Sequence, residues 1–291
     1  QLAQTEMPFG PVSLTKAWIE MLHRYFASGV GFLIIVLVVV AWLKRATLGL
    51  QTFYGAMVLL ILVCLQGAFG AWTVTLKLQP LIVSMHLLLA MILVIGLTCL
   101  GEFSHSAHQQ NRAFRKSPSY SLGWPVILLV VSLWQIFLGA WVSTNYAVLA
   151  CNGFPLCNGE LIPSQMDFEH GFTWWRELGK TASGEYLSVH ALTAIHWVHR
   201  LGALVILLTV IIFWVMTKAE ILKGDFLWQS RLTFWRKALM GVIFLQIGTG
   251  LSNVVLNWPM IAALAHTGGA ALLVICATQL ILLALPKPID S

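Results

Sequence analysis

The sequence predicts an all-α fold, a polytopic membrane helical bundle, and three observations carry this prediction. Of the 291 residues, 58% are hydrophobic and only 10% are charged, against roughly 25% charge in soluble domains. The mean hydropathy is +0.83. The apolar residues gather into runs of about 20, the length needed to cross a hydrocarbon core. A water-soluble enzyme is therefore excluded, and so is an outer-membrane barrel, whose strands alternate apolar and polar residues.

Seven runs are long enough to span a bilayer, and charged or turn-forming segments separate them. They cover about 18–43, 54–76, 81–103, 122–143, 189–216, 237–256 and 260–285. The first run ends at Lys44-Arg45, the second ends at Lys77, the third begins after Pro80, and the basic segment 105–116 separates the third from the fourth. The loop 144–188 precedes the fifth run, a basic stretch precedes the sixth, and Pro259 precedes the seventh.

The distribution of Lys and Arg predicts the orientation of the spans. Eleven of the 17 basic residues fall on one side and six on the other. By the positive-inside rule, the richer side is cytoplasmic. The amino terminus of this chain and the loop 144–188 are then external, and the carboxyl terminus is internal. We attribute the net charge of +6 to the basic segments that orient the spans in the membrane, and we predict no nucleic acid partner.

Two of the five cysteines lie in the external loop. Cys151 and Cys157 flank a turn-rich stretch that can bring their Cβ atoms together, and disulfides persist outside the cytoplasm. A disulfide is favoured over two free thiols. A metal site is disfavoured, because the spacing matches neither the Cys-x-x-Cys pattern nor its haem-attaching extension.

An internal repeat relates the two parts of the chain. A His-Arg pair opens a span twice, as His23-Arg24 and as His199-Arg200. A glutamine precedes a second histidine by 20 residues in both parts, from Gln66 to His86 and from Gln246 to His266. Equal spacing through a turn indicates duplicated helix pairs.

The repeat predicts two pseudo-repeated four-helix halves, 1–116 and 117–291. The span 122–143 and the cysteine loop precede the second His-Arg pair, whereas nothing comparable precedes the first. We therefore expect that the first helix of the first half is missing from this chain. The alternative is a cleaved signal peptide and a true seven-span protein.

The four repeated histidines predict two haem sites. Each lies about five to ten residues after the start of a span that enters from the external side, so all four share a similar depth. Histidines on two helices of one bundle half can bind haem iron from opposite faces. The expected pairs are His23 with His86 and His199 with His266. A hydrogen bond to a neighbouring helix would explain a single histidine, and zinc, with Glu20 as a third ligand, stays open in the first half.

Other repeated residues fit the same interpretation. Arg24 and Arg200 each follow a histidine, and a guanidinium at that position could pair with haem propionates or simply anchor the helix at the interface. Glycines near the histidines leave room either for a flat macrocycle or for close helix packing. These are Gly67, Gly70, Gly139, Gly248 and Gly250.

Taken together, these motifs resemble the haem A synthase family over nearly the whole chain. The resemblance rests on the stretch 20–27 around His23, on His86 after Pro80, on the Cys151–Cys157 loop, and on His199-Arg200 with His266. It implies a membrane oxidoreductase that converts the C8 methyl group of haem O to a formyl group, yielding haem A for terminal oxidases. It also implies a bacterial inner membrane or mitochondrial inner membrane location.

The resemblance assigns the sites as well. His199 and His266 would ligate a haem b cofactor, while His23 and His86 would flank the substrate haem O, with Glu20 as the essential carboxylate. The lipid bilayer, the enzyme that makes haem O and an unidentified electron donor are the implied partners, and a homo-oligomer is left open. We expect that an external cysteine pair, which would accompany the missing first span, is also missing from this chain.

The repeat itself is asymmetric at one position, independently of any family. The first half has Glu20 three residues before its histidine, where the second half has His196. A carboxylate beside a haem edge can move protons, so Glu20 is the first choice for acid–base work, with His23 and His86 completing the predicted catalytic set. The alternative for Glu20 is an interaction with the helix dipole.

Two rival functions stay open on sequence grounds. The first is a dihaem b-type electron-transfer cytochrome, in which both haems remain bound. The second is a haem carrier without chemistry, which would release the porphyrin that it took up. Oxidation of an unactivated methyl group needs redox chemistry that side chains lack, so the synthase interpretation requires haem iron.

Overall fold

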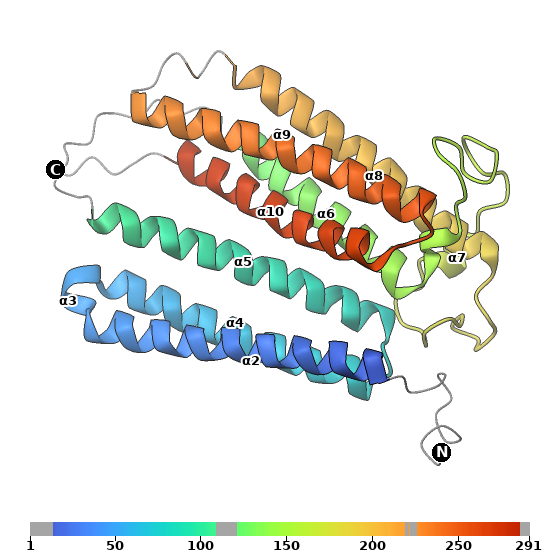
Figure 1. The fold of residues 1–291 in the computed structure, drawn as a ribbon, viewed down its shortest axis with the longest axis horizontal. Coiled ribbons are helices and arrows are strands. Elements are labelled where there is room, and N and C mark those ends of the chain that lie inside the picture. Colours follow the sequence, from blue (N-terminus) through green and yellow to red (C-terminus); the bar gives the residue numbers. More distant parts are fainter. Residues whose placement is uncertain (1–13, 109–120, 219–220, 222–225, 286–291) are drawn as a thin grey trace. The chain divides into compact units, whose positions relative to one another are not determined.

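The computed structural model describes residues 14–108, 121–218, 221 and 226–285, and long helices dominate it (Figure 1). The long helices are α2 (Leu14–Leu43), α4 (Leu50–Thr75), α5 (Pro80–His108), α6 (Gly123–Thr144), α8 (Val189–Met216), α9 (Phe226–Val255) and α10 (Met260–Ala284). Three short helices join them: α3 (Arg45–Leu48), η1 (Ala147–Leu149) and α7 (Phe168–Gly171). The described residues form no strand, only two isolated β-bridges in the loop between α6 and α8. The predicted all-α class is confirmed.

All seven predicted spans are present as helices long and apolar enough to cross a membrane. Their bounds agree with the prediction to within a few residues, except that α9 begins at Phe226, well before residue 237. Its first turns carry Arg231 and Arg236, and a search for apolar runs stops at such charges although the helical hydrogen bonds continue. Arg231 pairs with Glu102 of α5 at 2.8 Å. Buried Arg236 donates to the carbonyl of Trp214 at 2.5 Å and lies over that indole ring.

Contacts divide the chain into two units, residues 1–64 and 65–291. In the first unit, α2 and α3 contact each other, and Arg45 lies over the ring of Trp42 at 4.3 Å. Trp42 in turn packs on Phe53 of α4, with 5.0 Å between the ring centroids. The predicted boundary between the halves, at residues 116 and 117, lies outside the described residues. That division stays a prediction.

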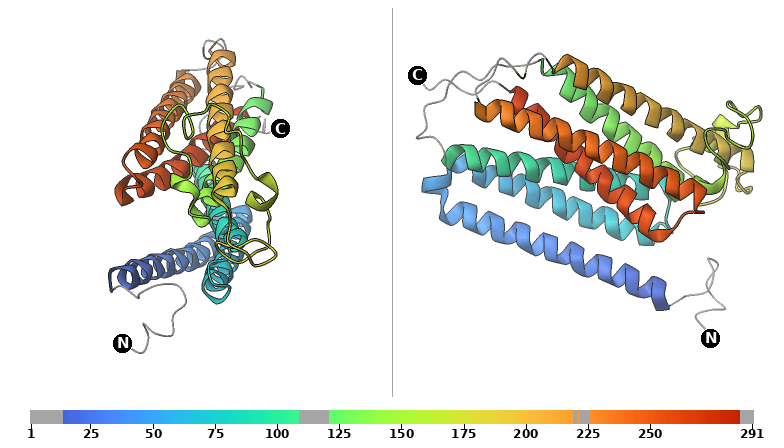
Figure 2. Two further views of the ribbon diagram at one scale, coloured as in Figure 1. Left: turned by 90° about the vertical axis from the view of Figure 1, so that its right-hand side faces the viewer. Right: turned by 45° about the horizontal axis from the view of Figure 1, so that its top comes forward.

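In the second unit, α6 is the central helix. It contacts α5, α8 and α10, and α10 also contacts α5 and α9 (Figure 2). The largest buried cluster lies between these helices, with Leu128 of α6, Phe213 of α8, Leu239 of α9 and Leu280 of α10 fully buried. Burial of large apolar side chains between the helices fixes their packing, as it does in other bundles.

The loop between α6 and α8 is tied to the end of the bundle by buried polar side chains. The indole nitrogen of Trp141 donates to the carbonyl of Gly171 at 3.0 Å. Arg176 is buried and donates to the side-chain oxygen of Asn145 at 2.5 Å and to the carbonyl of Lys180 at 3.2 Å. Because a buried polar group is costly unless it is hydrogen-bonded, these contacts give the long loop a defined conformation.

The turns joining α4 to α5 and α9 to α10 have the same backbone geometry. Lys77 and Leu78 in the first turn, and Asn257 and Trp258 in the second, have positive φ angles between 51° and 61°. In both turns the N–H of the second residue donates to the carbonyl five residues earlier, at 2.8 Å. Side chains with a Cβ rarely adopt this conformation, so its occurrence at matching positions extends the sequence repeat to the backbone. The grouping into two four-helix halves stays a prediction.

Candidate functional site

The site around His266 is built by α9 and α10. Gln246 of α9 donates its side-chain N–H to the backbone carbonyl of His266 at 3.0 Å. One turn further along α9, the hydroxyl oxygen of Thr249 lies 2.9 Å from Nδ1 of the imidazole. The imidazole edge at Cε1 lies against Gly250, where an added Cβ would be 3.2 Å from that ring carbon. A larger residue at position 250 would displace the imidazole.

His86 has the corresponding surroundings on α4 and α5. Gln66 donates to the backbone carbonyl of His86 at 3.0 Å, and an added Cβ at Gly70 would be 3.2 Å from its Cε1 atom. Both distances equal those around His266. The repeated Gln and Gly therefore have the same role in both helix pairs. The glutamine amide fixes the position of the histidine backbone relative to the neighbouring helix, and the glycine leaves space for the imidazole ring.

His199 shows the same arrangement a third time, which sequence reasoning missed. Gln135 of α6 donates to the backbone carbonyl of His199 at 3.0 Å, and the same nitrogen lies 3.1 Å from the ring atom Nδ1. An added Cβ at Gly139 would be 3.0 Å from Cε1 of the imidazole. The available signal was the pattern Gln-x-x-x-Gly, which begins at residues 66, 135 and 246, although it also begins at residue 51.

His199 of α8 and His266 of α10 both lie in the second unit, within range of an electrostatic interaction, and both side chains are partly buried. His86 is in the same unit, on α5. His23 is on α2 in the first unit, so the predicted pairing of His23 with His86 stays a prediction.

The two His-Arg motifs make the same contact one helical turn back. Arg24 donates to the carboxylate of Glu20 at 2.6 Å, and Arg200 donates through Nε to the imidazole Nε2 of His196 at 3.3 Å. The asymmetry seen in the sequence is thus an asymmetry of the arginine's partner, a carboxylate in one case and an imidazole in the other.

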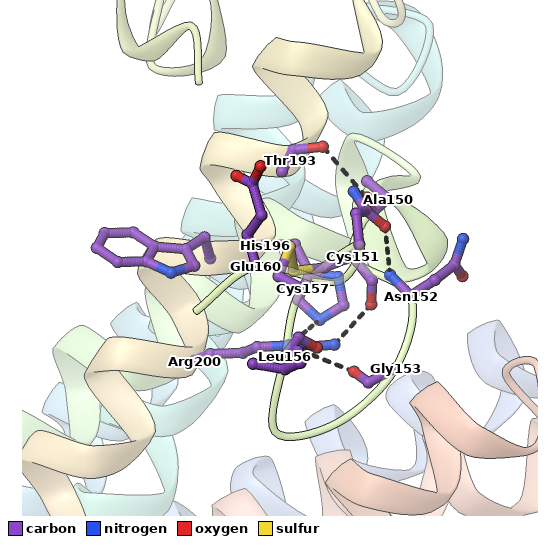
Figure 3. Close-up of a disulfide and its surroundings, with 12 residues drawn as sticks. Ala150, Cys151, Asn152, Gly153, Leu156, Cys157, Glu160, Thr193, His196 and Arg200 are labelled. Atoms are coloured by element: carbon purple, nitrogen blue, oxygen red, sulfur yellow. Dashed lines mark hydrogen bonds between the residues drawn. A yellow bond between two sulfur atoms is a disulfide. The ribbon is translucent and has the colours of Figure 1, made fainter. Parts of the chain in front are cut away.

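Arg200 also holds the cysteine loop (Figure 3). Its guanidinium donates to the carbonyls of Cys151 at 2.6 Å, Gly153 at 3.0 Å and Leu156 at 3.1 Å. Together with the contact to His196, four of its five N–H donors are engaged. The sequence predicted a contact between Arg200 and haem propionates. The structure shows a second task, bracing the loop, and the propionate contact stays a prediction.

The predicted cysteine pair is bonded as a disulfide, with 4.7 Å between its Cα atoms (Figure 3). The short loop that it closes is ordered by its own hydrogen bonds. The N–H of Cys157 donates to the carbonyl of Glu160 at 2.8 Å, and the N–H of Asn158 donates to the carbonyl of Asn152 at 2.9 Å. On α8, Thr193 donates to the carbonyl of Ala150 at 3.1 Å, so the loop is attached to this helix at two levels.

The donor set suits haem better than a structural metal ion. Within the described residues, no three side chains of the His, Cys, Asp and Glu types gather as a zinc site requires, so the zinc alternative gains no support. An imidazole placed next to a glycine can serve as an axial ligand of a flat macrocycle, because the glycine leaves the ring free of side-chain crowding. The residues present therefore fit haem.

The fold defines a multi-pass membrane protein, and three of its histidines share surroundings formed by a glutamine and a glycine. Residues 3–278 match the family model COX15-CtaA, described as cytochrome oxidase assembly protein. The chain belongs to this family. A protein of Shewanella oneidensis named "Heme A synthase" is 33% identical over 279 residues, which are 94% of this chain and 78% of that protein. Proteins of the same name from Brucella ovis and Brucella suis are 29% identical over 265 residues, 86% of this chain and 64% of theirs.

Proposed function

We propose that this protein is a haem A synthase, which oxidises the C8 methyl group of haem O to a formyl group. The family and the printed names of the relatives support an enzyme that acts on haem. Conversion of a methyl to a formyl group passes four electrons to an external oxidant and adds one oxygen atom from dioxygen or water. We propose that it proceeds through an alcohol and then a hydrated aldehyde, which loses water to give the formyl group. The rest of the proposal concerns which residues hold each haem.

His199 and His266 are the proposed axial ligands of a haem b cofactor. Their electrostatic interaction, their matched glutamine bonds and the glycine next to each ring support this assignment. When bound, haem b would supply the one-electron redox chemistry that no side chain offers. The protein itself would hold the two imidazoles at fixed positions along their helices, and its glycines would keep side chains out of the space next to each ring.

His23 and His86 are the proposed ligands of the substrate haem O. Glu20 is one helical turn from His23, so its carboxylate can lie beside a haem bound there and take up or release protons during the oxidation. Its contact with Arg24 keeps an arginine beside that carboxylate, at a position suited to a propionate group. The proposed partners are the enzyme that supplies haem O, an electron donor and the lipids of an energy-conserving inner membrane.

The matching surroundings of His199 and His266, each with a glutamine bond and an adjacent glycine, carry the proposal, and haem extraction tests it. The protein is purified with a supply of haem O, the haems are extracted, and each porphyrin is identified by mass. We expect a low-spin b-type spectrum in the purified protein and haem A among the products. His199→Ala and His266→Ala should each remove most of the b-type signal, whereas His190→Ala, an exposed histidine at the start of α8, should not.

Each rival outcome is distinct. Haem O recovered unchanged, with both haems retained, would indicate a dihaem cytochrome, and release of the same porphyrin would indicate a carrier. If the b-type spectrum survives in His199→Ala and His266→Ala but disappears in His86→Ala, the assignment of the two sites is reversed.

A further inference from the structure

Thr249 makes three contacts that together determine the role of its hydroxyl group. Its Oγ1 lies 2.7 Å from the carbonyl oxygen of Leu245, 3.3 Å from that of Gln246 and 2.9 Å from Nδ1 of His266. The hydroxyl donates to the backbone of the preceding turn, as helical threonines commonly do, and its shortest contact is the one to the Leu245 carbonyl. With its single hydrogen engaged there, the oxygen is an acceptor toward the imidazole, which places a proton on Nδ1 of His266.

We infer that Thr249 is a positioning residue that sets the tautomer and the ring plane of His266. A neutral imidazole carries one proton, so a proton fixed on Nδ1 leaves the Nε2 lone pair free for iron. The acceptor on Nδ1 also makes the imidazole a stronger donor to the metal, as outer-sphere hydrogen bonds do for ligating histidines elsewhere. The inference rests on the proposed function, because it assumes that His266 ligates haem.

The other two sites differ at this point. In the helix pair α4–α5, the position that corresponds to Thr249 is occupied by Phe69, whose ring packs against Trp72 with 5.1 Å between centroids. At His199, the group next to Nδ1 is the amide nitrogen of Gln135, at 3.1 Å. Among the three histidines seated by glutamine in the described part of the chain, a hydroxyl oxygen on Nδ1 is shown only for His266. This arrangement suits a ligand that stays bound through every turnover.

The test compares Thr249→Val, which keeps the shape and removes the hydroxyl, with Thr249→Ser, which keeps the hydroxyl. Thr267→Val is the matched control, because Thr267 donates to the carbonyl of Ala263 on α10 without contacting the imidazole. Three properties are measured on purified haem-loaded protein: the optical spectrum, the midpoint potential of the b-type haem, and the rate of haem transfer to excess apomyoglobin.

We expect Thr249→Val to retain a b-type spectrum but to lose haem tenfold or more faster, in line with the 10–100-fold effects of such hydrogen bonds on metal affinity. Its midpoint potential should rise, because a weaker imidazole donor stabilises ferric iron less. Thr249→Ser and Thr267→Val should behave like wild type. A purely structural role would change the yield of folded protein in Val and Ser variants alike and leave the potential unmoved.

Several results would overturn the inference. The first is a Thr249→Val protein with wild-type potential and haem transfer rate, in a background where His266→Ala has lost the b-type signal. The second is a folded Thr249→Ser protein whose midpoint potential and haem transfer rate differ from those of wild type, a result that decides the matter even if the valine variant does not fold. A wild-type protein that binds no haem through His266 would overturn both the proposed function and this inference, whereas the first two results leave the proposed function intact.

Discussion

Arg200→Lys tests whether the guanidinium braces the cysteine loop. The substitution keeps the positive charge next to His199 but replaces a fork of five donors by one ammonium group. In the structure, the guanidinium reaches three carbonyls of the loop at 2.6–3.1 Å. A lysine nitrogen reaching the same place could contact one of them well, so about two charge-assisted hydrogen bonds would be lost.

The expected effect follows from the energy of such bonds. A hydrogen bond to a charged group contributes about 1.5–3 kcal/mol to stability, so two of them give roughly 3–6 kcal/mol. Because Arg200 is only partly buried, water makes hydrogen bonds to the released carbonyls and offsets part of the loss. We therefore expect the free energy of loop opening to fall by about 2 kcal/mol. That is roughly a 30-fold larger population of the open loop, at 1.36 kcal/mol for each factor of ten.

Amide hydrogen exchange measures this population directly. The N–H groups of Cys157 and Asn158 are hydrogen-bonded within the loop. The exchange rate of a peptide that contains them therefore measures how often the loop opens. We expect roughly 30-fold faster exchange in Arg200→Lys. Trp197→Phe is the graded control, because it removes one neutral bond from the same helix to the carbonyl of Leu161, at 3.1 Å. Its effect should stay within about fivefold, as for a single bond of about 1 kcal/mol.

Two results would refute this reasoning. Unchanged exchange in Arg200→Lys would mean that the three carbonyl contacts contribute nothing to loop stability. Faster exchange only in haem-loaded protein, with no difference between wild type and variant without haem, would assign Arg200 to the propionates, as the sequence predicted.

Three further predictions concern single positions. Glu20→Gln keeps size and hydrogen bonding but loses the titrating proton, so we expect an intact b-type spectrum with little or no haem A among extracted haems; wild-type haem A levels would remove Glu20 from the mechanism. Peptide mapping without reductant should recover Cys151 and Cys157 as one linked peptide, and the cross-link should stabilise the loop by roughly 2 kcal/mol in the chain-entropy model; free alkylation of both would contradict it. Gly139→Ala should reduce b-type haem occupancy severalfold, because its Cβ would press on an imidazole 3.0 Å away, whereas Gly241→Ala, with open space around it, should not; equal occupancy in both would be inconsistent with ring crowding.

Much of the fold was predictable because apolar runs and basic flanks are local signals. The start of α9 was not, since the charges of Arg231 and Arg236 find their partners in other helices, which no local pattern reveals. Contacts between residues far apart in the sequence also explain why part of the candidate site was not predicted. Gln66 and Gln246 were found through their equal spacing to a histidine, whereas Gln135 is separated from His199 by the long loop. The carbonyls around Arg200 could not be predicted, because backbone groups leave no trace in residue type.

The glutamine bonds at His86 and His266 end on backbone carbonyls, not on the imidazole rings. Every residue has that carbonyl, so the anchoring of these helix positions is independent of the side chain they carry. The histidine can accordingly be exchanged without releasing the helix from its neighbour. A glycine at position 266 would leave a socket of imidazole shape in an otherwise unchanged bundle, into which free imidazole from solution could be placed as a detachable ligand.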